Sequence, residues 1–174
     1  MTAVIEPTTQ TWTLAQEIRA WAERTPDAVS MRAKRFGIWQ DITWADYADQ
    51  LDLVGHACLA LGMQPGDRVA VHSENRPEWL FADAGITAAR GITVGLYPTN
   101  PAPEVGYLLA DSGARILIAE DQEQVDKALL IEAECPDLEW IVFLDNRGVT
   151  TMDHPKLMPW QAFIDRGRVH REAY

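Results

Sequence analysis

The sequence predicts an α/β fold with a mainly parallel sheet and crossover helices, preceded by an N-terminal helix and a β-hairpin. Two observations support this prediction. From residue 43 onward, helical segments and short apolar strands alternate four times, a pattern typical of parallel strands joined by crossover helices. In addition, Ile116–Ala119 is continuously apolar, as expected of a strand covered on both faces.

The first part of the chain is predicted to contain a loose arm, a helix and the hairpin. Residues 1–12 lack helical or strand periodicity. Thr13 and Gln16 have the spacing of a capping box, and apolar residues with helical spacing follow them. Residues 28–42 alternate between apolar and polar side chains around a Phe-Gly turn, which predicts a hairpin with one face buried.

The middle of the chain holds the predicted helix–strand units. Helices are expected between Thr43 and Gly62, Pro77 and Gly91, Asn100 and Gly113, and Asp121 and Pro136; strands are expected at 69–71, 92–96, 116–119 and 140–144. The second of these helices is apolar almost all round, which predicts that it is buried. Gly91 is expected to end it.

Beyond residue 144 the pattern weakens. Residues 145–159 are rich in Asn, Gly, Thr, Asp and Pro, and only a short helix over 159–166 is expected. The polar end of the chain is expected to fray. The predicted organisation is therefore a loose arm over 1–12, one subdomain over 13–168 and a frayed tail over 169–174.

Composition excludes several classes of protein. A net charge of -11 over 174 residues argues against a nucleic-acid binder and weakly against docking onto anionic lipid; alternatively, the acidic residues only keep the surface soluble. Cys58 and Cys135 are interpreted as buried hydrophobes of a reducing compartment. Neither a signal-peptide pattern nor a run of transmembrane length occurs. A cytoplasmic location is expected, with peripheral membrane association left open.

Three polar segments follow predicted strands: 73–76, 97–100 and 120–122. Parallel sheets bind ligands at this edge, where helix N-termini attract anions. The alternative is that these residues only cap helices. No glycine-rich phosphate-binding fingerprint, GxSxG elbow or metal-ligand spacing of histidines is present, and His56 and His72 are interpreted as structural.

Five segments occur in an order and spacing that resembles one family. They are Ile42–Leu51, Gly66–Val71, Asn75–Trp79, Ala88–Pro101 and Leu108–Ala114. The first and fourth resemble the first two core motifs of the acyl-adenylate-forming superfamily, the AMP-forming acyl-CoA ligases and their relatives. The resemblance covers about residues 13–168, and Tyr97–Pro101 is most similar to long-chain fatty acyl-CoA ligases.

The resemblance implies an enzyme that joins a fatty acid or other carboxylate to coenzyme A, using ATP and magnesium. The family's phosphate loop, its later motifs and its C-terminal domain are not found in this sequence. We therefore expect the N-terminal part of the large domain, with no catalytic or metal-binding residue, no tightly bound cofactor and no activity alone. Its uncovered apolar surface is expected to self-associate.

The resemblance also implies a contact with coenzyme A, formed by Tyr97, Pro98, Thr99 and Lys127. Here Pro98 and Thr99 replace family glycines, and acidic residues flank Lys127. A packed tyrosine and a surface lysine are the alternative interpretation. Two other functions are weighed against the ligase: a non-catalytic binding or dimerisation module, and an unrelated nucleotide-binding α/β domain, for which no phosphate loop is found.

Overall fold

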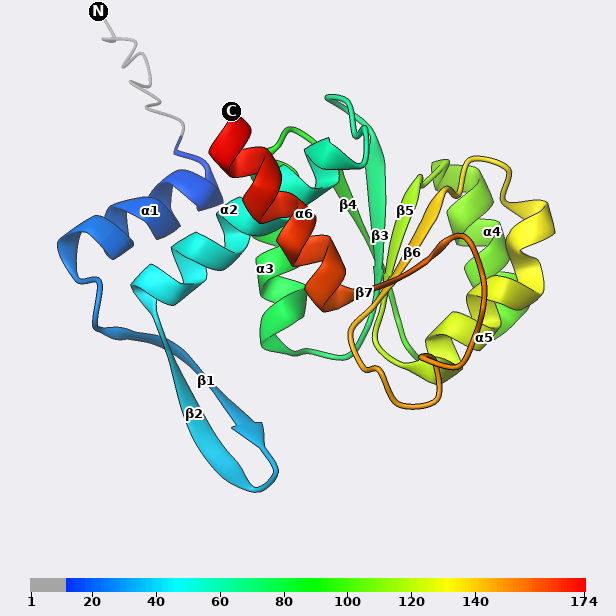
Figure 1. Cartoon of the computed structure of the whole chain (residues 1–174), viewed down its shortest axis with the longest axis horizontal. Coiled ribbons are helices and arrows are strands. Elements are labelled where there is room, and N and C mark those ends of the chain that lie inside the picture. The colour runs from blue at the N-terminus through cyan, green and yellow to red at the C-terminus, as the bar shows by residue number, and fades with distance from the viewer. Residues whose placement is uncertain (1–11) are drawn as a thin grey trace, which may run out of the picture.

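The computed structural model describes residues 12–174 and has the predicted α/β architecture (Figure 1). The helices are α1 (Leu14–Arg24), α2 (Trp44–Ala60), α3 (Pro77–Ala88), α4 (Ala102–Ser112), α5 (Gln122–Ile131) and α6 (Trp160–Ala173). The strands are β1 (Val29–Arg35), β2 (Ile38–Thr43), β3 (Arg68–His72), β4 (Ile92–Leu96), β5 (Ile116–Ala119), β6 (Trp140–Phe143) and β7 (Leu157–Pro159). The predicted arm, apart from Trp12, lies outside the described residues.

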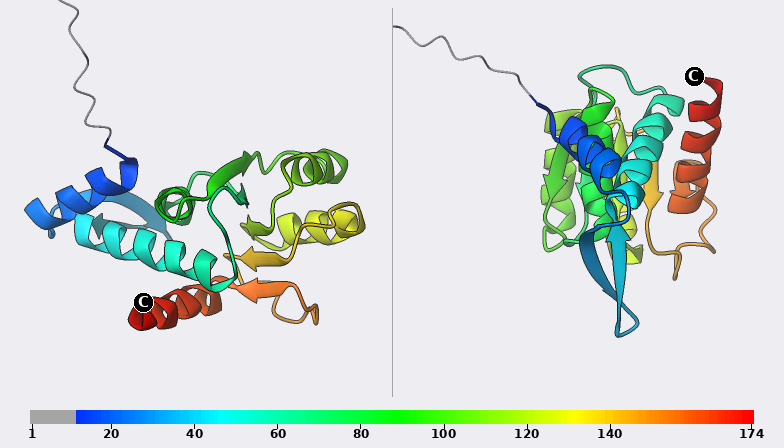
Figure 2. Two further views of the ribbon diagram at one scale, coloured as in Figure 1. Left: turned by 90° about the horizontal axis from the view of Figure 1, so that it is seen from above. Right: turned by 90° about the vertical axis from the view of Figure 1, so that its left-hand side faces the viewer.

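The central sheet confirms the parallel prediction. Its strands lie in the order β4-β3-β5-β6-β7, and each neighbouring pair is parallel. Helices α1, α2, α3 and α6 lie on one side of this sheet, and α4 and α5 lie on the other, as Figure 2 shows from two directions. Strands β1 and β2 form the separate antiparallel hairpin that was predicted.

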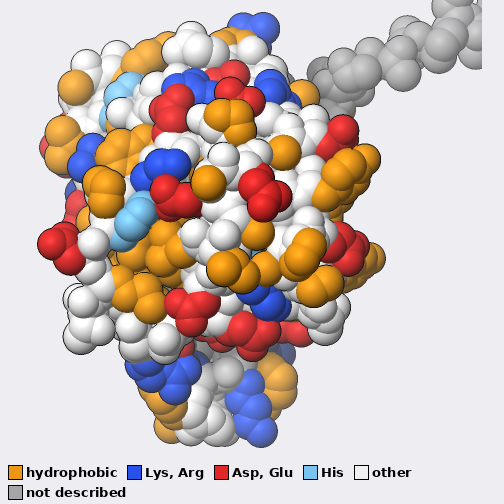
Figure 3. All heavy atoms as spheres, turned by 90° about the vertical axis from the view of Figure 1, so that its right-hand side faces the viewer, with side chains coloured by type: hydrophobic (Ala, Val, Ile, Leu, Met, Phe, Trp, Pro, Cys, Tyr) orange, Lys and Arg blue, Asp and Glu red, His pale blue; other side chains and the backbone are white. Residues whose placement is uncertain are grey.

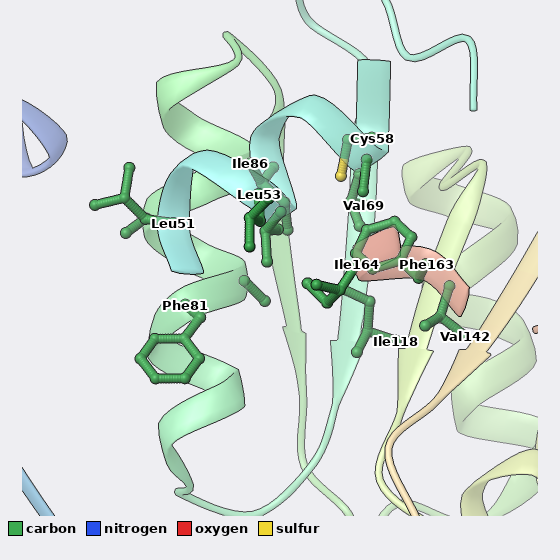
Figure 4. Close-up of a cluster of buried hydrophobic side chains, with 14 of the residues drawn as sticks. Leu51, Leu53, Cys58, Val69, Phe81, Ile86, Ile118, Val142, Phe163 and Ile164 are labelled. Carbon is green, nitrogen blue, oxygen red and sulfur yellow. The ribbon is translucent and has the colours of Figure 1, made fainter. Parts of the chain in front are cut away.

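Alternate side chains of the buried strands supply two hydrophobic cores. In β3, Val69 and Val71 face the α2 side, whereas Ala70 faces α4 and α5. Figure 4 shows the first core, in which Phe163 and Ile164 of α6 reach the sheet beside Val142. Because both faces are covered, the central strands have the continuously apolar sequences of a buried parallel sheet.

Local signals fix the helix boundaries. The predicted capping box of Thr13 with Gln16 is present in α1, and Thr43 forms a second one with Asp46 in α2. Gly113 adopts a left-handed conformation (φ +61°) at the end of α4, as a C-terminal glycine often does. The two threonine side chains and the backbone N–H of Gly113 satisfy helix-end groups that would otherwise lack partners.

The end of α3 differs from the prediction in detail. The left-handed residue is Arg90 (φ +68°), and the helix has already ended at Ala88. Gly91 is needed for a different reason: a Cβ there would lie 2.8 Å from Met63 Sδ and 2.9 Å from Ile86 Cγ2. The prediction that α3 is buried all round was also wrong, since Leu80 is 42% exposed.

The C-terminal region contains more structure than was predicted. Strand β7 pairs with β6 inside the supposedly irregular segment. Helix α6 continues through residues 169–173, so the prediction of a frayed tail there was wrong. Gly167 lets α6 approach α2 closely, because a Cβ there would overlap the Leu53 carbonyl oxygen. Beyond it, Arg171 pairs with Asp49 at 2.7 Å and His170 Nδ1 lies 3.0 Å from His56 Nδ1.

The hairpin exists, but its predicted burial was wrong. No residue of β1 or β2 is fully buried, and Val29 is 39% exposed. The two strands project away from the body of the molecule, below the helices in Figure 1. Both cysteines, in contrast, are free and buried as interpreted, and burial raises the pKa of Cys58 to about 12.

Candidate functional site

The polar segments predicted to follow the strands lie together at the carboxyl edge of the central sheet. Residues 73–76 follow β3, residues 97–100 follow β4, and residues 120–122 follow β5. A fourth loop, which sequence reasoning did not single out, follows β6. Its Asp145 N–H donates to the Glu120 carbonyl oxygen at 2.8 Å. Crossover helices place all four loops at one edge because the strands are parallel.

Glu120 joins two of these loops. Its carboxylate accepts hydrogen bonds from the Glu74 backbone N–H at 2.7 Å and from Ser73 Oγ at 3.3 Å. It also pairs with Arg76 Nη1 at 3.4 Å, while Arg76 Nε lies 2.8 Å from Glu78 Oε2. The Glu120 side chain is 22% exposed, so these contacts are only partly hydrated. They fix the loop after β3 against the end of β5.

The backbone of the 97–100 loop is held by one residue of β3 and one of α5. His72 Nε2 lies 3.2 Å from the Tyr97 carbonyl oxygen, and Lys127 Nζ donates to the Pro98 carbonyl oxygen at 2.7 Å. Asn100 is 9% exposed, and its amide donates to Glu104 at 3.2 Å. The Tyr97 side chain is 78% exposed. The backbone of this loop is therefore anchored, while its aromatic ring is open to solvent.

His72 is the buried ionisable group of this edge. It has no exposed surface, and its Nδ1 has no hydrogen-bond partner among residues 12–174. Burial, together with the nearby charge of Lys127, lowers the pKa of His72 to about 4. The ring is therefore neutral at pH 7, with Nε2 donating to Tyr97. This position agrees with the structural role interpreted from the sequence.

The helix N-termini at this edge are not equivalent. The Asp121 carboxylate caps α5 by accepting from Glu123 N at 3.0 Å and Gln124 N at 3.4 Å. At this helix, the alternative interpretation of polar residues as caps is confirmed. Helices α3 and α4 have no side-chain cap and carry proline in the first turn. The prolines lack an N–H, and Trp79 N and Glu104 N donate to the carbonyl oxygens of Arg76 and Pro101, so these helix ends offer few free donors to an anion.

The structure brings together the residues that the resemblance assigned to coenzyme A. Pro98 and Lys127 are in direct contact. Thr99, two residues after Tyr97 in the sequence, is exposed. The ring of Tyr97 is open to solvent. Lys127 fits a phosphate poorly. Its ammonium already contacts Gln124 Oε1 at 3.1 Å and Glu123 at 2.8 Å.

The charges around Lys127 are mutually satisfied. The hydrogen bond from the Lys127 ammonium lowers the pKa of Glu123, which favours the charged form of this carboxylate. The buried Gln124, 5% exposed, accepts a hydrogen bond from the same ammonium. Sequence reasoning missed Gln124 and the role of Glu120. Glu120 already belonged to the predicted polar segment 120–122, but its partners come from the loop after β3 and have no local sequence signal.

Two other kinds of feature are absent from residues 12–174. No three His, Cys, Asp or Glu side chains there are grouped as metal ligands would be. In the same residues, no helix has the length and apolar character needed to cross a bilayer.

Comparison with known proteins identifies the fold and its relatives. The family model described as AMP-binding enzyme matches residues 18–164. A long-chain-fatty-acid–CoA ligase of Mycobacterium tuberculosis is 32% identical over 128 residues, which are 74% of this chain and 21% of the ligase. Acetoacetyl-CoA synthetase of Streptomyces lividans superposes with a TM-score of 0.74 at 20% identity, over 86% of this chain and 24% of the synthetase.

A third similar protein is much shorter. An uncharacterised protein of Mycobacterium tuberculosis is 32% identical over 146 residues, which are 84% of this chain and 78% of that protein. By contrast, this chain spans about a fifth of the length of the curated ligases that it matches first.

Proposed function

Because the chain belongs to the AMP-binding enzyme family, we propose that it forms the N-terminal part of the large domain of an AMP-forming long-chain acyl-CoA ligase. The observation that carries this proposal is the family match over 18–164, which spans the parallel sheet and its carboxyl-edge loops. The long-chain specificity is supported by the names of relatives at 26–32% identity. The complete enzyme would convert a fatty acid, ATP and coenzyme A to acyl-CoA, AMP and pyrophosphate, with magnesium on the ATP phosphates.

The 174-residue chain by itself is proposed to lack adenylating activity. Its carboxyl edge offers paired carboxylates and cations but no glycine-rich phosphate loop, and that loop is what would hold ATP. The test is pyrophosphate release by the purified chain with ATP, magnesium and a long-chain fatty acid. We expect the rate to equal that of a protein-free control. Turnover that scales with the concentration of the chain would contradict the proposal.

The carboxyl edge is proposed to contact coenzyme A through residues 97–99, with Lys127 fixing that loop to α5. Tyr97 supplies the open ring, and the 2.7 Å bond from Lys127 to Pro98 holds the loop that carries it. Titration of coenzyme A into the chain tests this. Tyr97→Ala should weaken binding on the order of tenfold, because stacking of a base on an aromatic ring contributes about 1–3 kcal/mol.

A matched control separates this contact from a general loss of exposed aromatic surface. Tyr107 on α4 is 66% exposed and lies outside the carboxyl-edge loops. Tyr107→Ala should leave coenzyme A binding unchanged. Lys127→Met should weaken binding less than Tyr97→Ala, since Glu123 already neutralises the lysine charge. Equal affinity in the wild type and Tyr97→Ala would remove the residue from the proposed contact.

The second candidate is a non-catalytic module that associates with itself. It is supported by the short relative, 78% of which is matched. It is also supported by an apolar groove of about 620 Å³ between α2 and α6, lined by Ala60, Ala162, Asp165, Arg166, Val169, His170 and Ala173. Sedimentation velocity of the chain and of Val169→Asp tests whether this groove forms the contact that the module requires. A dimer that dissociates in Val169→Asp would favour the module, and a monomer at high concentration would count against it.

A further inference from the structure

The tip of the β1–β2 hairpin, residues 34–39, combines exposed apolar side chains with cations. Phe36 is 90% exposed, Ile38 70% and Trp39 64%. Lys34 and Arg35 come directly before them. Large exposed apolar side chains gathered in one place mark interaction surfaces more often than single ones do. In Figure 3 the hairpin is the projection at the foot of the view, where basic and hydrophobic side chains lie together.

The strand register distributes these residues over both faces of the tip. Lys34 pairs with Trp39, and Arg35 pairs with Ile38. Successive side chains of a strand point to opposite faces, so each face carries one cation and one apolar residue. Phe36 occupies the turn itself. Such an arrangement suits entry of the tip end-on into an apolar layer, with the cations remaining at its polar boundary.

The turn carries a further indication. Phe36 (φ +49°) and Gly37 (φ +82°) both have the positive φ of a type I′ turn, which favours Asn or Gly. A bulky aromatic residue in the left-handed region is conformationally unfavourable. Its occurrence at the most projecting point of the hairpin indicates a role for the ring that outweighs this cost, as is common for strained residues at binding surfaces.

Electrostatics identifies the partner. The whole chain has a net charge of -11, yet residues 32–41 contain three cations and only one acid. Arg32 pairs with that acid, Asp41, at 2.7 Å. Among residues 12–174, no carboxylate lies within salt-bridge distance of Lys34 or Arg35, and the Arg35 guanidinium lies over the Phe36 ring instead. The tip therefore presents positive charge beside exposed rings on an otherwise acidic protein.

We propose that residues 34–39 dock this protein onto the surface of an anionic lipid bilayer. Phe36, Ile38 and Trp39 enter the interfacial layer, and Lys34 and Arg35 meet the lipid phosphates. The overall acidic charge, which argues against adsorption of the whole surface, instead restricts contact to the hairpin. This docking does not depend on the proposed ligase function, because it uses neither the carboxyl edge nor coenzyme A.

The test is flotation of the 174-residue chain with two kinds of vesicle. One kind is phosphatidylcholine alone, and the other is phosphatidylcholine with about one third phosphatidylglycerol. We expect binding to the anionic vesicles only, and weaker binding as salt is added. Phe36→Ser with Trp39→Ser should reduce partitioning at least on the order of tenfold. Lys34→Gln and Arg35→Gln should each reduce it on the order of fivefold.

Matched controls use equally exposed residues elsewhere. Leu130 is 76% exposed on α5, and the Arg147 side chain is 89% exposed after β6. Leu130→Ser and Arg147→Gln should leave partitioning unchanged, with circular dichroism confirming that every variant is folded. Binding that is absent, or that is unaffected by the tip substitutions, would overturn the proposal. Loss of self-association in Phe36→Ser, without vesicle binding by the wild type, would instead assign the tip to a second copy of the chain.

Discussion

The carboxyl edge of the sheet and the hairpin tip both present an exposed aromatic residue near a cation, yet they are built differently. At the sheet edge, Lys127 already contacts three oxygen-bearing groups, and the loop that carries Tyr97 is anchored to buried residues. At the tip, Lys34 and Arg35 have no carboxylate partner among the described residues, and the strands are exposed. The first arrangement suits a small ligand in a fixed place. The second suits a lipid bilayer, whose surface has no fixed binding position.

The comparison predicts that acidic residues matter for stability at the edge and not at the hairpin. Glu120→Ala should lower the free energy of unfolding by about 2–3 kcal/mol, because it leaves the Glu74 N–H without its acceptor and leaves Arg76 paired with Glu78 alone. Asp41→Ala should cost less than about 0.5 kcal/mol, since its pair with Arg32 is half exposed. Urea unfolding of both variants measures this. An equal decrease in the free energy of unfolding in both variants would show that acidic residues stabilise the two regions to the same extent, which would contradict this prediction.

The second prediction concerns the pH dependence that His72 gives the edge. Its pKa is about 4 in the folded chain and about 6.5 when unfolded. The unfolded state therefore binds the proton first as pH falls. The contribution of neutral His72 to the free energy of unfolding is therefore present above about pH 6.5 and is lost as the pH falls toward 4. We expect the free energy of unfolding to fall by about 2 kcal/mol between pH 7 and pH 5.

The variant His72→Gln keeps a donor for the Tyr97 carbonyl oxygen but cannot titrate. Its stability should change less than that of the wild type over the same pH interval, and urea unfolding at pH 7 and pH 5 measures the difference. Among residues 12–174, no buried ionisable group faces the hairpin tip, so Lys34→Gln should leave the pH dependence as it is. A wild-type slope retained in His72→Gln would contradict the assignment.

The smallest expected effect is a gain in stability at the tip. Phe36→Asn places a residue that tolerates positive φ in the type I′ turn, and should stabilise the chain by about 0.5 kcal/mol. The same variant should bind anionic vesicles more weakly than the wild type. Thermal unfolding followed by flotation gives both values. A substitution that lowers stability would mean that the Phe36 ring packs within the protein.

The sequence was most informative where local chemistry and tertiary packing agree. The capping residues Thr13, Thr43 and Asp121 and the apolar run Ile116–Ala119 specified their elements correctly. Strand β7 was missed because three residues ending in Pro159 are too short for a periodic signal, and proline is tolerated at the edge of a sheet. The predicted helix ended too early, at residue 166, because Gly167 resembles a helix stop. In the structure this glycine instead allows the close contact of α6 with α2.

The candidate site was predictable only in part. The order of strands and loops, and the family motifs, located the carboxyl edge and residues 97–99. They could not show that Lys127 bonds to Pro98 or that Glu120 joins the loops after β3 and β5, because these contacts connect residues 29 and 44–47 positions apart. The hairpin alternation was correctly identified as a strand signal, but burial depends on neighbouring layers, which alternation alone does not specify.

Hydrogen–deuterium exchange tests the central distinction between the two regions most directly. The chain is labelled alone, with coenzyme A, and with anionic vesicles, and protection is compared for the backbone amides of Tyr97 and Thr99 and of residues 34–39. We expect coenzyme A to protect the first set only and vesicles to protect the second set only. Protection of both sets by either partner, or protection of the hairpin by coenzyme A, would contradict this expectation.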